Sequence, residues 1–411
     1  MATVVLAGTL DTKGEEVAFV RDRVRALGPE VVVVDVGILG PPLAAADVDR
    51  ETVARAAGTT VAALVAEGDR GRAIDAMARG LTAVARDLRA AGRLDAMAGL
   101  GGGGGTQLIA TAMRELPVGV PKLLVSTMAS GDTRPYVGTS DLTLMHAVVD
   151  VAGLNSLSRR ILGNAAAAVA GMATAAAGSV DTPSAKPVVG ATMFGVTTPC
   201  VTVARERLEA LGYEVLVFHA TGVGGRTLEG LVRDGTVRAV LDATTTELAD
   251  ELVGGVLSAG PDRLEAAGAM GIPQVVSLGA LDMVNFGPAE TVPDRFRDRR
   301  FHRHNAAVTL MRTTPAECAA LGAQLAAKLS AARGPVTLFV PLRGVSAIAA
   351  AGGAFHDPAA DAALLGAIRR DLGPNVTLRE VDAEINDPAF ATAMADELDR
   401  LVRGAGPGPA S

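Results

Sequence analysis

The sequence of 411 residues contains no tryptophan, aromatic residues make up 3% of it, and its two cysteines are Cys200 and Cys318. Two cysteines so far apart can build neither a disulfide framework nor the closely spaced ligand set of a structural zinc site. Such sparing use of cysteine predicts a cytoplasmic protein. The shortage of aromatic side chains argues against the stacking platforms that bind single-stranded nucleic acids.

Positive charge is also scarce, since 38 Lys and Arg against 45 Asp and Glu give a formal net charge of −7. General nucleic-acid binding depends on clustered cations that neutralise phosphates, so we expect no nucleic-acid partner. Long apolar runs are lacking as well. The run at residues 3–8 is too short for a signal peptide, and the alanine-rich stretch 165–178 is shorter than a membrane span. We expect that stretch to be a helix in a soluble core. We also expect the protein to have no membrane partner.

Short apolar runs alternate with helical periodicity along the chain, a pattern typical of parallel strands that helices cover on both faces. The expected strands are residues 3–8, 31–37, 94–101, 120–127, 186–195, 214–222, 237–246, 273–282 and 335–344. This alternation predicts the α/β class, with two Rossmann-like doubly wound parallel-sheet domains. The segment 176–187, rich in Ser, Pro and Gly, is the expected boundary. The predicted parts are therefore residues 1–183, residues 187–405, and a disordered tail at 406–411.

Five consecutive glycines, Gly101, Gly102, Gly103, Gly104 and Gly105, stand between an expected strand and an amphipathic helix. At such a turn, backbone N–H groups and the positive helix end can hold an anion, and glycine lets a phosphate approach the backbone. Thr106 can cap the helix or contact a phosphate oxygen. The run lacks the lysine of a Walker A loop, and no acidic residue follows about 20 positions on to bind a ribose. The alternative is a tight turn where a helix packs on the sheet, which explains one or two glycines but hardly five.

The first expected strand runs into GTLDTKGEE, where Thr12 and Glu15 have the spacing of a capping box and predict a helix start. Lys13 then lies in the first turn, where a cation opposes the helix dipole. A bound phosphate would reverse that sign, and a solvated lysine with a small penalty is an equal alternative. Asp11 and Asp35 stand at strand ends, where they can bind Mg²⁺ through its waters, hold a ribose, or act as turn residues.

Polar side chains also follow the expected strands of the second half, where open parallel sheets bind their ligands. The candidate catalytic residues there are Asp242, Glu247, Asp282, Asn285 and His304. His302 and His304 can ligate a metal, although surface or hydrogen-bonded histidines are commoner, and metal binding by side chains is left open. Several polar loops converging on one cleft favour a small-molecule substrate site.

Nine strings of the sequence resemble one known family. In unchanged order, GTLDTK, GLGGGGGT, VPKLLVSTMASG, YVGTSDL, TMFGVTTPCV, LVFHATGVGGR, LDATTTE, SLGALDMVNFGP and LMRTT resemble the ATP-binding inhibitory domain of the tomato mosaic virus resistance protein and its bacterial relatives. The resemblance runs from about residue 3 to about residue 400. It implies two Rossmann-like subdomains, ATP on the first of them, and association into homodimers; Mg²⁺ is expected with the ATP.

The resemblance assigns nucleotide binding to three loops. They are Gly8, Thr9, Asp11, Thr12 and Lys13; Gly101 to Gly105 with Thr106; and Met128, Ala129, Ser130 and Gly131. The plant protein has a serine within its glycine run, so for this chain the resemblance implies the backbone cradle and does not imply a side-chain hydroxyl contact. In plants and fungi the domain is fused to a barrel-like domain related to phosphoenolpyruvate hydrolases. A separately encoded barrel-like partner is therefore a further expectation.

Two functions fit these observations. The first is an ATP-dependent enzyme of small-molecule metabolism, of the ligase or phosphotransferase type, with its site in the cleft between the domains. The density of polar loop residues in the second domain favours it. The second is a nucleotide-regulated protein-binding module without turnover. Dinucleotide-dependent redox chemistry is disfavoured because the acid that would bind a ribose is missing.

Overall fold

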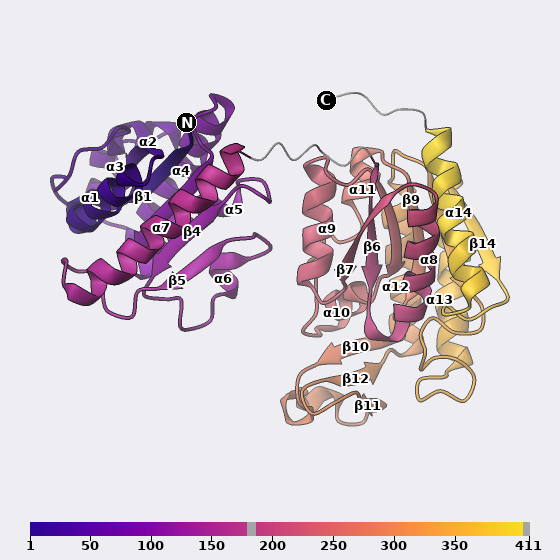
Figure 1. Ribbon diagram of the computed structural model, residues 1–411. Helices are drawn as coiled ribbons and strands as arrows, with labels where there is room; N and C mark the ends of the chain where they lie inside the picture. The colour runs from indigo at the N-terminus through magenta and orange to yellow at the C-terminus, as the bar shows by residue number, and fades with distance from the viewer. Residues whose placement is uncertain (179–185, 406–411) are drawn as a thin grey trace. The chain divides into compact units, whose positions relative to one another are not determined.

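A computed structural model of the chain describes residues 1–178 and 186–405, and the chain divides into two compact units, Met1–Asp181 and Thr182–Ser411. Each unit is a parallel sheet covered by helices (Figure 1), which confirms the predicted α/β class with two Rossmann-like domains. The predicted boundary at 176–187 lies mostly outside the described residues, and the predicted tail at 406–411 lies wholly outside them.

The first unit contains a five-stranded parallel sheet in the order β2-β1-β3-β4-β5. The strands are β1 (Thr3–Gly8), β2 (Glu30–Asp35), β3 (Ala96–Gly101), β4 (Lys122–Ser126) and β5 (Thr143–His146). The helices are α1 (Leu10–Ala26), α2 (Arg50–Ala56), α3 (Val61–Glu67), α4 (Arg70–Ala90), α5 (Gly103–Arg114), α6 (Arg134–Val137) and α7 (Ser156–Gly178). The chain adds β2 on one side of β1 and β3 on the other, so the strand order reverses between β1 and β3. Ligands of such sheets bind at this reversal.

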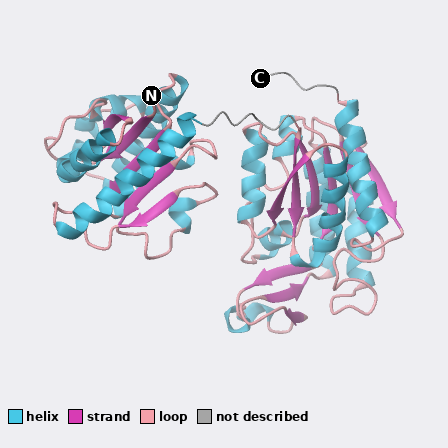
Figure 2. Cartoon of the chain, viewed as in Figure 1, coloured by secondary structure: helices cyan, strands magenta, loops and turns pink. Residues whose placement is uncertain are grey.

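Helices cover both faces of the first sheet (Figure 2). On one face, α1 and α7 pack through buried residues such as Val17 and Leu162. On the other, α4 and α5 pack through residues such as Leu81 and Ile109. The predicted helix at 165–178 is the second half of α7. By length and composition alone, α7 is apolar enough to cross a membrane, and 33% of its most apolar window is buried in this fold.

The second unit contains a six-stranded parallel sheet in the order β14-β13-β9-β8-β6-β7. The strands are β6 (Val188–Met193), β7 (Glu214–His219), β8 (Ala239–Thr244), β9 (Gln274–Gly279), β13 (Val336–Pro341) and β14 (Val376–Val381). The longer helices are α8 (Thr198–Ala210), α9 (Val223–Arg233), α10 (Glu247–Val253), α12 (Pro315–Ser330), α13 (Pro358–Asp371) and α14 (Pro388–Gly404), with the short α11 (Ala266–Met270) and the 3-10 turns η1 (Gly195–Thr197), η2 (Ala289–Thr291) and η3 (Asp294–Phe296). Residues of α8 and α14 cover one face, and residues of α9 to α13 cover the other.

A second sheet of the second unit was not predicted. It is antiparallel, in the order β10-β12-β11, and its strands are β10 (Met283–Phe286), β11 (Phe301–Arg303) and β12 (Thr309–Arg312). It lies beyond one end of the six-stranded sheet (Figure 1). The predicted strand 273–282 is too long, because β9 ends at Gly279 and Ala280 turns the chain with φ of +58°.

The start of α1 corrects the predicted helix boundary. The helix begins at Leu10, two residues before the expected cap at Thr12. The Leu10 N–H donates to the Asp35 carboxylate at 3.1 Å, so an acid from β2 caps the helix. The Thr12 hydroxyl instead contacts the Thr9 carbonyl at 3.3 Å, and Lys13 breaks the helical geometry with φ of −135°.

Candidate functional site

A cavity of about 660 Å³ opens in the first unit where the strand order reverses between β1 and β3. Its volume lies in the range of small-molecule sites. The residues around it are Thr9, Asp11, Thr12, Lys13, Val36, Gly37, Ile38, Leu39, Leu64, Val65, Gly68, Asp69, Arg70, Ala73, Ile74, Met77, Gly102, Gly103, Gly104, Gly105, Leu108 and Asp150. Most of the lining is apolar, from the loop after β2 and from α3 and α4. The polar part consists of the glycine amides, the hydroxyl groups of Thr9 and Thr12, two cations (Lys13 and Arg70) and three acids (Asp11, Asp69 and Asp150).

The polar part is centred on the first turn of α5. Gly102 is the N-cap residue, and the first amide to donate within this turn is that of Thr106, to the Gly102 carbonyl at 2.8 Å. Across residues 1–178 and 186–405, no acceptor is found for the amides of Gly103, Gly104 and Gly105. Free amides at a helix N-terminus, together with the helix dipole, favour a bound anion.

Within the run, glycine is required by packing at some positions and not at others. A Cβ on Gly101 would stand 2.8 Å from the carbonyl carbon of Gly105, so the fold itself requires glycine there. A Cβ on Gly102 or Gly103 would meet its nearest atom at 3.9 Å, which is ordinary contact. Packing therefore does not require glycine at 102 and 103. Both residues border the cavity, so we expect a methyl group there to hinder an anion that approaches the backbone.

The other helices that begin at the cavity are already capped by side chains of the protein. Asp35 accepts from the Leu10 N–H of α1, and Asp69 accepts from the Arg72 N–H of α4 at 3.1 Å. A carboxylate in these positions takes the place that a ligand anion would occupy. The start of α5 thus differs from the starts of α1 and α4 in leaving its amides open.

Lys13 brings a cation to the same cavity. Its Nζ donates to the carbonyl of Val151, in the segment that follows β5. The neighbouring Glu16 is 2% exposed and accepts from the Gly153 N–H at 2.5 Å, which ties α1 to this segment a second time. The ammonium group is therefore held at the cavity by a neutral carbonyl, which a phosphate oxygen can replace at a gain in charge pairing.

Asp11 and Asp35 hold the loop after β2. Asp35 is 2% exposed, with Oδ1 accepting from Leu10 and Gly37 and Oδ2 paired with Arg50 at 2.7 Å. Asp11 accepts from the Leu39 N–H at 2.7 Å through Oδ2. Asp11 borders the cavity, whereas Asp35 does not. The carboxylate of Asp35 is fully engaged, so we leave Asp35 out of the proposed ligand contacts.

Other predicted nucleotide contacts do not line the cavity. Thr106 is fully buried, and its hydroxyl contacts Ser126 Oγ at 2.6 Å. Ser126 Oγ also accepts from the Met128 N–H at 2.9 Å, so Thr106 links the loops after β3 and β4. Gly8 packs against Val17. Of the sixteen predicted nucleotide contacts, those outside the cavity lining are Gly8, Asp35, Gly101, Thr106, Met128, Ala129, Ser130 and Gly131.

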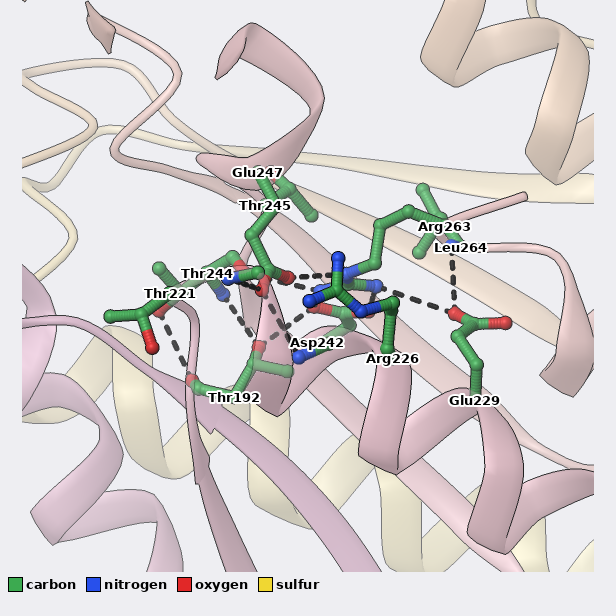
Figure 3. Close-up of polar contacts among 12 residues, drawn as sticks. Thr192, Thr221, Arg226, Glu229, Asp242, Thr244, Thr245, Glu247, Arg263 and Leu264 are labelled. Atoms are coloured by element: carbon green, nitrogen blue, oxygen red, sulfur yellow. Dashed lines mark hydrogen bonds and ion pairs between the residues drawn. The ribbon is translucent and has the colours of Figure 1, made fainter. Parts of the chain in front are cut away.

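In the second unit, Asp242 and Glu247 belong to a buried ion-pair cluster around Arg263 (Figure 3). Arg263 is fully buried and donates to both oxygens of Asp242, at 2.5 and 2.7 Å, and to Glu247 Oε2 at 2.7 Å. Glu229 lies 3.6 Å from the same guanidinium. The three acids hold the pKa of Arg263 well above its ordinary value even though burial alone would lower it.

Glu247 also closes the glycine-rich turn of the second unit. Its Oε1 accepts from the N–H groups of Gly222 and Gly225, at 2.6 and 3.0 Å, at the start of α9. A Cβ on Gly225 would stand 2.1 Å from Glu247 Oε2. Here glycine makes room for the protein's own carboxylate, so this turn is not open to a phosphate as the start of α5 is.

The remaining predicted catalytic residues lie apart from this cluster. Asp282 is 1% exposed and accepts from Ser346 Oγ at 2.8 Å, and burial raises its pKa to about 6. Asn285 is fully buried and donates to Asp250 at 2.6 Å, where burial raises the pKa of the acid to about 7. His304 is exposed at the end of β11. Asp242, Glu247, Asp282 and Asn285 are thus shielded from solvent in this structure, and their catalytic role stays a prediction.

Within residues 1–178 and 186–405, no three side chains of His, Cys, Asp or Glu gather as a metal site. His302 instead packs its ring against Phe355, with ring centroids 6.2 Å apart. Sequence reasoning missed Arg70 and Asp150, which both reach the cavity of the first unit. No motif marks either residue, because each is brought there from a different part of the chain by the sheet topology.

The chain matches two domains of one family, described as "Uncharacterised protein family (UPF0261)": the N-terminal domain over residues 2–178 and the C-terminal domain over residues 186–402. A UPF0261 protein of Clostridium tetani is 50% identical over 97% of this chain and 98% of its own length. A UPF0261 protein of Rhizobium meliloti is 49% identical over 96% and 97%. The ToMV resistance protein Tm-1 of Solanum lycopersicum is 47% identical over 80% of this chain and 44% of its own length. With both domains matched and the two bacterial relatives aligned over nearly their full length, this chain belongs to the UPF0261 family.

Proposed function

We propose that the first unit is a nucleotide-binding domain that takes ATP with Mg²⁺ in the cavity at the start of α5. The observation that carries this proposal is the set of free amides of Gly103, Gly104 and Gly105 opening into the cavity beside Lys13. Backbone amides and a lysine are the groups that cradle phosphates in other strand-to-helix turns. The resemblance of the first-unit loops to an ATP-binding domain supports the same ligand.

The apolar part of the cavity suits the base and sugar of a nucleotide. Aliphatic side chains such as Ile38, Leu39 and Val65 supply this surface. Leu39 and Val65 are 82% and 54% exposed, so a ligand that covers them gains free energy from apolar burial. Mg²⁺ would reach the site on the phosphate oxygens, because this ion keeps most of its waters and needs only one or two carboxylates. Asp150 is exposed at the cavity and is suited to contact those waters.

Two functions of the bound ATP remain to be distinguished. As an ATP-dependent enzyme of the ligase or phosphotransferase type, the protein would spend ATP on a small acidic or carbonyl substrate. As a nucleotide-regulated protein-binding module, it would hold ATP without turnover. The burial of Asp242, Glu247, Asp282 and Asn285 favours the second, because none of these side chains can touch a substrate without rearrangement.

An ATP-consumption assay separates the two functions. The full chain is incubated with Mg-ATP and a panel of carboxylates and carbonyl compounds, and release of ADP, AMP, phosphate or pyrophosphate is measured. Turnover stimulated by one class of compound establishes the enzyme and names its substrate class. His304→Ala is the informative variant, since this exposed residue can be removed without opening the core. Tight ATP binding with no stimulated turnover establishes the binding module.

We also propose a homodimer with a separately encoded barrel-like partner, as the family resemblance implies, and a cytoplasmic location, which the sparing use of cysteine favours. Light scattering of the purified chain, with and without Mg-ATP, tests the dimer. Affinity purification from cells tests the partner, and a purified monomer that recruits no barrel-like protein would contradict both.

A further inference from the structure

Arg70 stands beside the open amides of α5. It is the first residue of α4, its side chain is exposed, and it borders the cavity. Its Nη2 lies 3.3 Å from the point where a Cβ on Gly104 would stand. Gly104 is the second residue of α5, so the guanidinium of one helix start lies against the open turn of another.

The guanidinium of Arg70 has no hydrogen-bond or ion-pair partner in the described part of the chain. The adjacent carboxylate of Asp69 is turned to the Arg72 N–H, and Arg72 pairs with Glu67. A cation at the first position of a helix is disfavoured by the helix dipole. The guanidinium of Arg70 lies near the positive N-terminal ends of both α4 and α5. Asp11, Asp69 and Asp150 also line the cavity, but Asp11 and Asp69 already accept from backbone N–H groups, and none of the three is paired with Arg70 in the described part of the chain.

Lys13 and Arg70 differ in what they offer a phosphate. Lys13 comes from α1 and presents a single ammonium group that is already hydrogen-bonded to Val151. Arg70 comes from α4 and presents a planar guanidinium with unused donors, a group that binds phosphates through two parallel hydrogen bonds. The apolar side chains of α3 and α4 that line the cavity can contact a base, but they carry no charge with which to bind a phosphate.

We propose that Arg70 is a phosphate-binding residue that makes the cavity selective for nucleoside polyphosphates over nucleoside monophosphates. This inference rests on the proposed nucleotide site and adds the residue that sets its preference for phosphate number. A polyphosphate chain carries enough negative charge to meet Arg70, Lys13 and the open amides at once. A monophosphate leaves part of that positive charge without a partner.

Titration calorimetry with ATP and AMP on the full chain tests the assignment. We expect Arg70→Met to lower ATP affinity by about tenfold or more, the effect of losing a charged hydrogen bond, and to lower AMP affinity much less. Arg70→Lys should retain part of the ATP affinity. The matched control is Arg72→Met, which removes an exposed arginine two residues away whose partner is Glu67.

The possible results distinguish a wrong role for Arg70 from a wrong assignment of the nucleotide site itself. If the unchanged protein binds neither nucleotide, the proposed function fails and the inference fails with it. If it binds ATP and Arg70→Met binds ATP equally well, Arg70 is only a solvated side chain and the inference alone fails. Equal losses for ATP and AMP would show a general disturbance of the cavity and would also overturn it. A circular dichroism melt of each ligand-free variant confirms folding.

Discussion

Arg263 and Asp242 form a bidentate ion pair in which both hydrogen bonds, of 2.5 and 2.7 Å, are shielded from solvent. Glu247 and Glu229 also form ion pairs with this guanidinium, so the single positive charge of Arg263 is paired with three carboxylates. Removing one partner of a buried pair leaves the other charges without compensation, which costs more than the pair contributed. This cluster joins β8, α9, α10 and the loop before α11 (Figure 3).

Arg263→Met should therefore destabilise the second unit by about 3–5 kcal/mol. The chain has no tryptophan and two tyrosines, Tyr136 in the first unit and Tyr213 in the second. In a Tyr136→Phe background, the intrinsic emission on urea unfolding reports Tyr213 alone. Arg343→Met, at an exposed ion pair with Asp382, is the control and should change stability by less than about 1 kcal/mol. Equal urea midpoints for the two variants would contradict this view of the cluster.

Asp250 should make the second unit less stable as the pH rises. Burial raises its pKa from 3.8 to about 7, although Asn285 and Leu257 donate to the charged form. Between about pH 4 and 7 the folded protein keeps a proton that the unfolded chain has lost. Stability therefore falls across this window, by up to about 1.4 kcal/mol per pH unit, and levels off above it.

Asp250→Asn should remove most of that slope, because an amide cannot ionise. The Asn285 amide can turn to accept from the new side chain, since its oxygen has no partner among the described residues. Urea midpoints from pH 4 to 8 measure the effect. A smaller fall of stability with pH should remain in the variant up to about pH 6, because burial also raises the pKa of Asp282 to about 6. Parallel curves for the variant and the unchanged protein would contradict the assignment.

The sequence predicted the two parallel sheets because buried parallel strands are near-continuous apolar runs, as in β1 and β8, whose residues are all buried. It missed β5 and β14 because these edge strands are partly exposed and lack that pattern. It missed β10 to β12 because short antiparallel strands depend on pairing with each other. Their partners lie up to 29 residues apart along the chain, as Met283 does from Arg312.

The part of the candidate site that backbone groups form could be predicted from the sequence. The contacts between side chains from distant parts of the chain could not. Five glycines between a strand and a helix indicate an anion site by local geometry, and α5 begins there. Asp242 and Glu247 have the composition of catalytic acids, but only the tertiary structure shows that Arg263, sixteen or more residues later, neutralises both. The same holds for Asp35, whose partner Arg50 turns a candidate ribose ligand into a loop support.

Gly101→Ala and Gly103→Ala should have opposite effects. At position 101 a methyl group would press on the backbone of Gly105, so we expect a loss of stability of about 1–3 kcal/mol. At position 103 the methyl group meets only Met128 Sδ at 3.9 Å, and alanine suits a helix better than glycine. Gly103→Ala should thus keep or raise thermal stability while weakening ATP binding, measured by melting and calorimetry on the same samples. Unchanged ATP affinity in a stable Gly103→Ala protein would place the phosphates elsewhere.

Lys13→Ala should weaken ATP binding by about 1.5–3 kcal/mol, the contribution of a hydrogen bond to a charged group. The ammonium now donates to the Val151 carbonyl, so binding a phosphate exchanges a neutral acceptor for a charged one. Stability without ligand should change little, because Glu16 still ties α1 to the Gly153 N–H. Arg23→Ala removes an exposed cation from the same helix, where it packs over Phe19, and should leave ATP affinity unchanged. If calorimetry gave the two variants the same affinity as the unchanged protein, Lys13 would belong only to the contact between α1 and the segment after β5.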